Sequence, residues 1–128
     1  MSMAKTEKRV RAALSKWAVR LGLGWWNIKA RYYDDAKEIK RRFGGGKDST
    51  VAARCYADWR YMEATIDVNL PAWKGKTDDE IERMAVHELM HILVNEMREG
   101  AIEHEERVVT TLTKAVFWVD AAAREDEV

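Results

Sequence analysis

The chain has 128 residues, a length that suits one domain with a single modest hydrophobic core and excludes two independent cores. Hydrophobic residues make up 47% of it, which excludes intrinsic disorder, and no apolar run approaches the roughly 20 residues of a membrane-spanning helix. The formal net charge is zero, but residues 1–60 hold 15 Lys and Arg against 6 Asp and Glu, and residues 61–128 hold 7 against 16. We expect the two halves to pair with each other rather than to form one large charged surface.

The only cysteine, Cys55, cannot form a disulfide within the chain. Lys16 and Arg20 interrupt the apolar run near the N-terminus that a secretory signal would need. These features predict a cytoplasmic protein without membrane association. No internal repeat is visible, so residues 1–128 are predicted to form a single domain.

The first predicted element is an amphipathic helix over residues 5–21. Apolar residues recur there at steps of four, three and four, which places them on one stripe of a helix. These residues are Val10, Leu14, Trp17 and Leu21. Two glycines then end the helix, and a half-buried strand is predicted over residues 25–33, where apolar and polar side chains alternate. Trp17 and Trp26 lie on the inner faces of these elements and are predicted to be core residues.

Residues 34–49 are predicted to form a mobile connection. Residues 36–43 have a composition that suits a short helix, but the overlapping stretch RRFGGGKDS has the glycine and charge content of a flexible loop. The basic segment KEIKRRFGGGK, residues 37–47, is also suited to contact with phosphates, so nucleic acid is a second predicted partner through this segment.

A β-hairpin is predicted next, with strands over residues 50–57 and 62–70 joined at DWRY. Apolar and polar side chains alternate along the second strand, which places the apolar ones on one face. Pro71, the only proline, ends the strand because it has no N–H to donate. The sheet is therefore expected to have about three strands and to contain an antiparallel pair.

Two helices follow. Thr77 and Glu80 form a capping box, in which each side chain accepts a backbone hydrogen bond of the other residue, so a helix is predicted from there to about Met97. A last helix is predicted over residues 102–122. Its predicted inward residues are Val108, Val109, Leu112, Val116 and Val119.

The stretch AVHELMHIL, residues 85–93, contains the motif HExxH. His87 and His91 lie one helical turn apart on the same face, so both imidazoles can reach one ion at about 2.0 to 2.1 Å. Glu88 is offset by about 100° around the helix, where it can act on a water as a general base without binding the ion. Three polar side chains in an apolar run each need a partner, which favours a metal site over a purely structural helix.

A catalytic zinc site usually has three protein ligands, and the stretch EHEE, residues 103–106, supplies candidates for the third. If the last two helices form a hairpin, residues 105–108 come level with His91. Glu105 shares a face with the predicted inward residues of the last helix, so it is the predicted third ligand. Glu106 and His104 remain alternatives.

HELMH, followed by a short turn and an acid-bearing helix and preceded by a helix and a small sheet, resembles the minimal zincin-like metallopeptidases. This group is related in layout to the SprT-like and ImmA/IrrE families and to short phage-encoded proteins. The resemblance implies an α+β fold of the zincin-like type, a Zn²⁺ ion, a glutamate third ligand as in gluzincins, and hydrolysis of a peptide or protein substrate. Only His87, Glu88 and His91 match a specific motif. The distance in sequence from His91 to Glu105 is short for large gluzincins, and SprT-like proteins generally use a third histidine.

In this interpretation Glu88 takes a proton from the attacking water and passes it to the leaving nitrogen. Zincins usually bind an extended substrate along an edge strand, so residues 64–69 are predicted to pair with the substrate. Asn95 is a candidate for supporting His91. The candidates for stabilising the oxyanion are Tyr56, Tyr61, His104 and Arg107. The alternative hypotheses are a zinc-binding regulatory or nucleic-acid-associated protein with latent or absent peptidase activity, and hydrolysis of another carbonyl-type bond.

Overall fold

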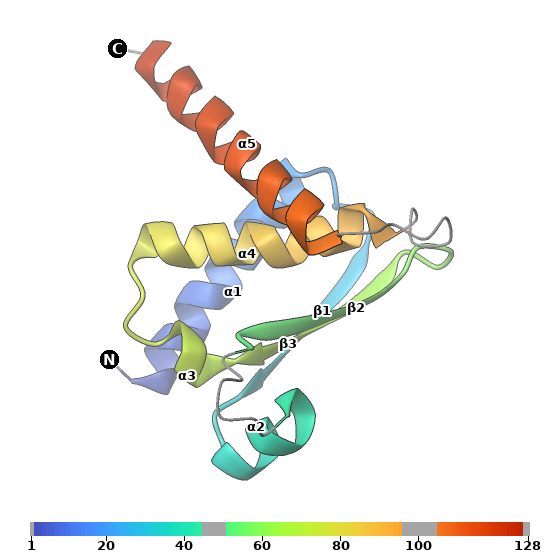
Figure 1. The fold of residues 1–128 in the computed structure, drawn as a ribbon, viewed down its shortest axis with the longest axis vertical. Helices are drawn as coiled ribbons and strands as arrows, with labels where there is room; N and C mark the ends of the chain where they lie inside the picture. Colours follow the sequence, from blue (N-terminus) through green and yellow to red (C-terminus); the bar gives the residue numbers. More distant parts are fainter. Residues whose placement is uncertain (1, 45–50, 96–104, 127–128) are drawn as a thin grey trace.

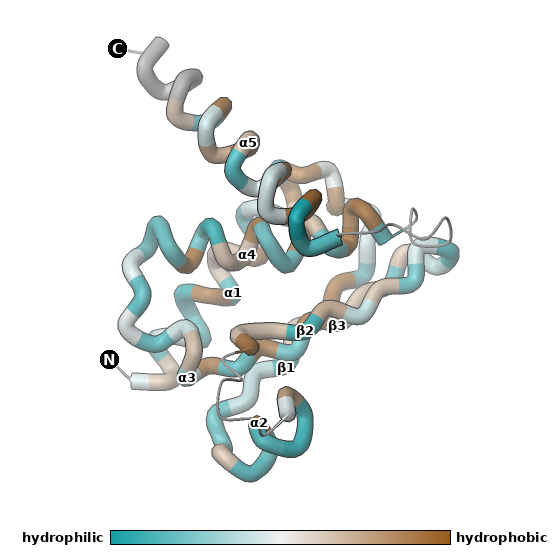
Figure 2. Tube along the Cα trace, in the orientation of Figure 1, coloured by the Kyte–Doolittle hydropathy of each residue, from teal (hydrophilic) through white to brown (hydrophobic). Residues whose placement is uncertain are grey.

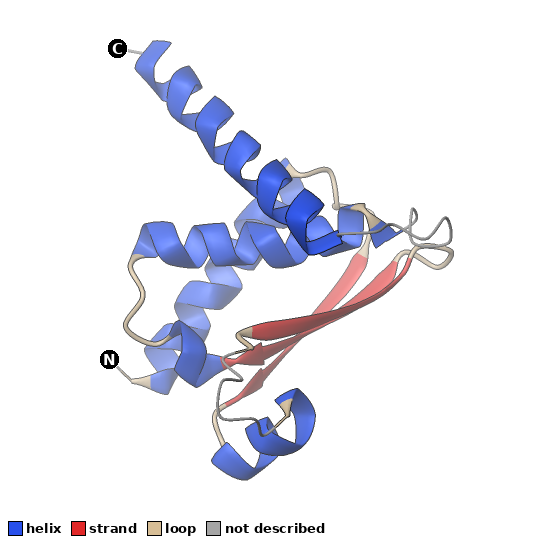
Figure 3. Cartoon of the chain, in the orientation of Figure 1, coloured by secondary structure: helices blue, strands red, loops and turns tan. Residues whose placement is uncertain are grey.

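The computed structural model describes residues 2–44, 51–95 and 105–126. In chain order the elements are α1 (Met3–Arg20), β1 (Asn27–Tyr33), α2 (Ala36–Phe43), β2 (Ala53–Asp58), β3 (Glu63–Asn69), α3 (Leu70–Trp73), α4 (Asp78–Leu93) and α5 (Glu105–Asp126). The described residues thus form an α+β fold with five helices and one three-stranded sheet, which confirms the predicted class (Figures 1 and 3). None of the described helices has the length and apolar character needed to cross a membrane.

The sheet has the strand order β1-β3-β2 and is mixed. β2 and β3 form the predicted antiparallel hairpin, and β1 pairs in parallel with the other side of β3. The prediction that residues 64–69 pair with a substrate is therefore wrong, because β3 has a strand on each side and its main-chain groups are engaged. Among the described residues, the strands at the edges of the sheet are β1 and β2.

Helices α1, α3 and α4 cover one face of the sheet, and α2 lies on the other (Figures 1 and 3). The core forms between the covered face of β3 and the apolar faces of α1 and α4. Its fully buried members include Val10, Ile66, Val68, Ala85, Val86 and Leu89. Trp17 is 3% exposed, as predicted for a core residue, whereas Trp26 is only partly buried against this core.

Ion pairs join the basic first half of the chain to the acidic second half. Arg9 of α1 contacts Asp78 at the start of α4, with Nη2 2.6 Å from Oδ1, and Lys16 contacts Glu82 one turn further along α4. The predicted pairing of the two halves is therefore confirmed at the packed surface between α1 and α4.

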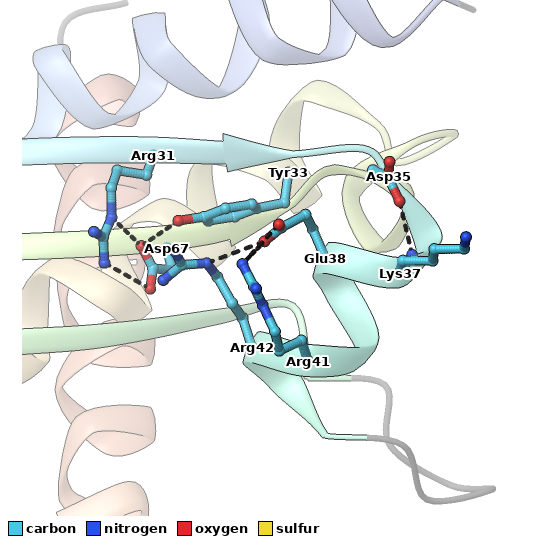
Figure 4. Close-up of polar contacts among 8 residues, drawn as sticks. All are labelled: Arg31, Tyr33, Asp35, Lys37, Glu38, Arg41, Arg42 and Asp67. Carbon is cyan, nitrogen blue, oxygen red and sulfur yellow. Dashed lines mark hydrogen bonds and ion pairs between the residues drawn. The ribbon is translucent and has the colours of Figure 1, made fainter.

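The face of the sheet beneath α2 carries a buried acidic residue (Figure 4). The side chain of Asp67 is 3% exposed, and its two oxygens accept hydrogen bonds from Arg31 at 2.6 and 3.1 Å. The hydroxyl of Tyr33 lies 3.5 Å from the same carboxylate. This two-point contact to Arg31 compensates the desolvation of the Asp67 charge and fixes β1 to β3 on this face.

Part of the predicted mobile connection is a helix. The Asp35 carboxylate accepts a hydrogen bond from the Lys37 N–H at 2.8 Å and caps the start of α2, and Phe43 at its end is 2% exposed and lies against the ring of Tyr33. The prediction of a mobile connection is thus wrong for residues 36–43, and residues 45–50 lie outside the described part. The helix is mostly hydrophilic (Figure 2).

The positive charge of the basic segment 37–47 is partly neutralised by Glu38, which belongs to the same segment. Arg41 and Arg42 both contact Glu38, at 2.7 and 3.5 Å (Figure 4). The described part of this segment belongs to α2 and lies on the opposite face of the sheet from α4 (Figure 1). Its predicted contact with nucleic acid stays a prediction.

Helix α4 starts with the predicted capping box. Thr77 Oγ1 accepts a hydrogen bond from the Glu80 N–H at 3.2 Å, and Glu80 Oε2 accepts one from the Thr77 N–H at 3.4 Å. The helix ends at Leu93, earlier than predicted, and Met97 lies outside the described residues.

Helix α5 is rotated relative to its predicted orientation. Val109 is fully buried, but Val108, Leu112 and Val119 are 38%, 39% and 58% exposed, so their predicted inward orientation is wrong. Phe117 is buried instead, with its ring centroid 5.1 Å from that of Trp17. Burying this large aromatic ring removes more apolar surface from water than burying a valine, which favours the observed rotation.

Candidate metal centre

Helix α4 places the two histidines of the HExxH motif on the side that faces the first turn of α5. Its apolar residues Val86 and Leu89 are fully buried in the core and fix the orientation of the helix about its own axis. The side chains of His87 and His91 are 28% and 12% exposed, and their ring centroids lie 5.2 Å apart. Both rings are therefore partly shielded from water and lie side by side.

One carboxylate from α5 bridges the two rings. Glu106 Oε2 lies 3.1 Å from His87 Nε2, and Glu106 Oε1 lies 2.9 Å from His91 Nε2. Within the described residues, His87, His91 and Glu106 each offer one ligand atom, and these atoms all lie within 4.8 Å of one another. The structure thus brings together the two predicted histidines and one of the two alternatives for the third ligand.

Glu105, the predicted third ligand, lies on the other side of His91. Its Oε2 atom is 2.7 Å from His91 Nδ1, and its side chain is 13% exposed. The structure therefore places Glu105 against the nitrogen of His91 that points away from His87 and Glu106. The role of Glu105 as a ligand stays a prediction, and His104 lies outside the described residues.

The donor set fits a divalent cation such as zinc. Zinc bonds of about 2.1 Å in a tetrahedral arrangement place neighbouring ligand atoms about 3.4 Å apart. The short contacts of 3.1 and 2.9 Å involve different oxygens of Glu106, and with one ligand atom from each residue the three atoms lie within 4.8 Å of one another, so the side chains must draw closer to hold an ion. Imidazole nitrogens with a carboxylate oxygen are also the ligands that zinc takes in catalytic sites.

His91 makes a contact with a carboxylate through each of its two ring nitrogens. Both of its ring nitrogens face carboxylate oxygens, at 2.7 and 2.9 Å, yet a neutral imidazole carries one N–H. The second contact is compatible with a second N–H on the ring, with an O–H on the Glu106 carboxyl, or with a cation between Nε2 and Glu106. A neutral ring that donates Nδ1–H to Glu105 leaves the Nε2 lone pair directed at such a cation.

Glu88 lies beside this cluster in a partly buried position. Burial raises the pKa of its carboxyl from 4.5 to about 7; the charge of His91 lowers this pKa and the Glu106 carboxylate raises it. A carboxyl group that titrates near neutral pH can both accept and donate a proton there.

A pocket of about 490 Å³ extends from the cluster between α4, α5 and the start of β2. His87, Glu88 and Glu106 line one part of it. The remainder is lined by Val51, Ala52 and Ala53 before and in β2, by Arg83 and Met84 of α4, and by Thr110, Thr113 and Lys114 of α5. The pocket is therefore continuous with the candidate metal centre, and its size suits a small ligand or a side chain.

The predicted oxyanion-stabilising residues do not gather at this pocket. Tyr56 is 52% exposed and lines a separate hollow with Lys29 and Thr65, and Tyr61 is 73% exposed. Arg107 is exposed and does not line the pocket. The sequence did not predict that Arg83, Thr113 and Lys114 line the pocket. For the two residues of α5 a signal was present, because Thr113 and Lys114 follow Glu106 by seven and eight positions, the spacing of one helix face.

Asn95 has a structural contact. It is 7% exposed, and its Oδ1 atom accepts a hydrogen bond from the Trp59 N–H at 3.0 Å. This bond joins the β2–β3 turn to the end of α4. Asn95 thus fixes the helix end beyond His91 through the hairpin, in place of the direct support of His91 predicted from the sequence.

Comparison with known proteins adds no relative. No protein-family description, no curated protein and no solved structure matches the chain. The function is therefore argued from the motif and from the geometry of the described residues.

The raised pKa of Glu88 predicts that the metal-free protein becomes less stable as the pH rises. The folded state holds a proton on Glu88 up to about pH 7, whereas an ordinary glutamate loses it near 4.5. Between these values the folded state binds more protons, so stability falls with pH, by about 3 kcal/mol in total. Glutamine cannot ionise. In urea unfolding with a chelator present, Glu88→Gln should be more stable than wild type at pH 8, and the difference should shrink at pH 5.

The exposed residue Glu63 provides the matched control, and Glu63→Gln should show no such pH-dependent difference from wild type. Equal stability of wild type and Glu88→Gln at both pH values would contradict the raised pKa.

Proposed function

We propose that this protein is a zinc-dependent metallopeptidase of the minimal zincin-like type. His87, His91 and Glu106 are the zinc ligands in this proposal, and Glu88 is the general base. The supporting observation is that both Nε2 atoms lie against the Glu106 carboxylate, at 3.1 and 2.9 Å, next to the partly buried Glu88 carboxyl group of α4.

In this proposal Glu105 supports His91 in place of binding the metal ion. By accepting a hydrogen bond from His91 Nδ1, it holds the ring in the tautomer that leaves Nε2 free to bind a metal ion. Carboxylates in this position orient a histidine ligand and raise its basicity. Adjacent residues of α5 thus act on the two nitrogens of one imidazole.

The chemistry follows from these positions. Zinc, when bound, polarises a carbonyl group and lowers the pKa of a water molecule that it holds. Glu88 accepts the proton as water attacks the peptide carbonyl and then donates it to the leaving nitrogen.

An extended substrate is proposed to pair with β2, not with β3. The Asn69 N–H donates to the Ala52 carbonyl at 2.9 Å, which sets the register of the antiparallel pair. Because main-chain groups alternate in direction along a strand, those of Ala53 and Ala57 point away from β3 toward the outer edge. Ala53 also lines the pocket beside Glu88, so a peptide added at this edge passes the proposed catalytic group.

The test of this function is cleavage of a mixed peptide library by the zinc-loaded protein, read by mass spectrometry of new termini. Cleavage should stop when a chelator removes the metal and should return when zinc is restored. A protein that holds one zinc ion per chain and cleaves no peptide in the library would contradict the proposal.

A further inference from the structure

The pocket beside Glu88 is lined by apolar and by cationic side chains. Ala52, Ala53 and Met84 supply apolar surface, and Arg83 and Lys114 supply positive charge. The guanidinium of Arg83 is already engaged, because its Nε donates to Asp79 at 2.9 Å and it lies 4.6 Å from the centroid of the Phe117 ring.

Lys114 is different. It is exposed at the rim of the pocket and forms no ion pair with any residue in the described ranges. The acids that share the pocket with it are Glu88 and Glu106, and Glu106 contacts both histidines. The ammonium group of Lys114 is therefore available to a ligand.

We propose that this pocket binds a carboxylate group of the substrate through Lys114, an inference that rests on the proposed peptidase function. The aliphatic part of the bound group lies against Met84 and Ala53, and its carboxylate meets the ammonium group at the rim. Pockets that bind small ligands combine such apolar walls with a few polar groups that set specificity.

The direction of β2 identifies the substrate position. β2 begins at the pocket with Ala53 and runs away from it to Asp58. A substrate strand antiparallel to β2 therefore has its C-terminal part at the pocket. For a substrate bound in this antiparallel direction, the recognised carboxylate belongs to the residue that follows the cleaved bond, either as an acidic side chain or as the end of the substrate chain.

Four peptides separate these two sources. They share one cleavable sequence with either Glu or Gln after the cleaved bond, and each is made with a free or an amidated C-terminus at that residue. An accessible ion pair is worth up to about 1 kcal/mol, so kcat/KM should favour the carboxylate-bearing peptide about fivefold. A preference for Glu in the amidated pair identifies the side chain, and a preference for the free terminus in the Gln pair identifies the chain end. Equal rates for all four peptides would overturn the inference.

Variants of Lys114 test the residue itself. Lys114→Met should bring the preference to about one, and Lys114→Glu should reverse it in favour of peptides with a lysine at that position. Lys8→Met, on the exposed side of α1, is the matched control and should keep the wild-type ratio. Because the readout is a ratio between peptides, a general loss of activity does not affect it. A Lys114→Met protein with an unchanged ratio would overturn the inference.

Binding to the zinc-loaded Glu88→Gln protein separates this inference from the proposed function. Fluorescence anisotropy with the same four peptides should give the same fivefold preference, lost when Lys114→Met is added. If wild type cleaves nothing but the binding preference is present, the peptidase proposal fails and the carboxylate site stands. If cleavage occurs without any preference, the peptidase proposal stands and the carboxylate site fails.

Discussion

Replacement of Glu88 by Gln is expected to lower kcat/KM for peptide cleavage by about 100- to 10,000-fold, the range for loss of a general acid–base group. Glutamine keeps the size of the side chain and its position in α4, but its amide cannot take a proton from water at neutral pH. The proposed ligands His87, His91 and Glu106 are unchanged, so zinc content should stay at the wild-type level. The measurement combines single-peptide kinetics with elemental analysis of the same preparations.

Glu63→Gln, on the other face of the sheet, serves as the control and should cleave at the wild-type rate. Two outcomes would refute the role of Glu88. If the Glu88→Gln protein still cleaves peptides rapidly, Glu88 is not the general base. If the Glu88→Gln protein loses its zinc, Glu88 is a zinc ligand.

Zinc is expected to raise the unfolding temperature of the wild-type protein strongly. A ligand that binds only the folded state at about 1,000 times its Kd stabilises by about 4 kcal/mol. His87→Ala and His91→Ala should lose nearly all of this shift, because each removes a proposed ligand. The measurement is differential scanning fluorimetry of each protein with zinc and with chelator.

Two adjacent substitutions on α5 then identify the third ligand. Glu106→Gln should lose most of the zinc-dependent shift, whereas Glu105→Gln should retain a shift with zinc affinity reduced about 10- to 100-fold, the effect of losing a group that orients a ligand. The two variants are matched controls for each other, since they remove the same charge from neighbouring positions. The opposite order would restore Glu105 as the ligand and contradict the assignment of Glu106.

Features set by neighbouring residues could be predicted from the sequence. The capping box at Thr77, the β2–β3 hairpin and the histidine pair of α4 each depend on contacts within a few residues or on helical periodicity. The parallel pairing of β1 with β3 could not be predicted in this way, because it joins segments separated by 36 residues, as in the Asn27↔Glu63 pair. Such pairing depends on how the whole sheet packs against α1 and α4.

For a related reason, the sequence could not predict which of Glu105 and Glu106 lies against both Nε2 atoms. The sequence pattern suggested that Val108 and Leu112 face inward, which would also turn Glu105 toward the two Nε2 atoms. In the structure Phe117 packs against Trp17, a residue 100 positions earlier, and this contact rotates α5 so that Glu106 faces both rings. Periodicity shows that a helix has an apolar stripe but does not decide between two overlapping stripes.

Helix α5 contributes three side chains to the proposed site. Glu106 is the proposed metal ligand, Glu105 orients His91, and Lys114 is the proposed substrate contact. Because these side chains have fixed spacings along one helix, a shift or tilt of α5 displaces all of them together. Selection for a new substrate preference in this fold is therefore constrained: substitutions that reposition α5 alter metal affinity as well, and independent tuning requires single side-chain changes at the rim.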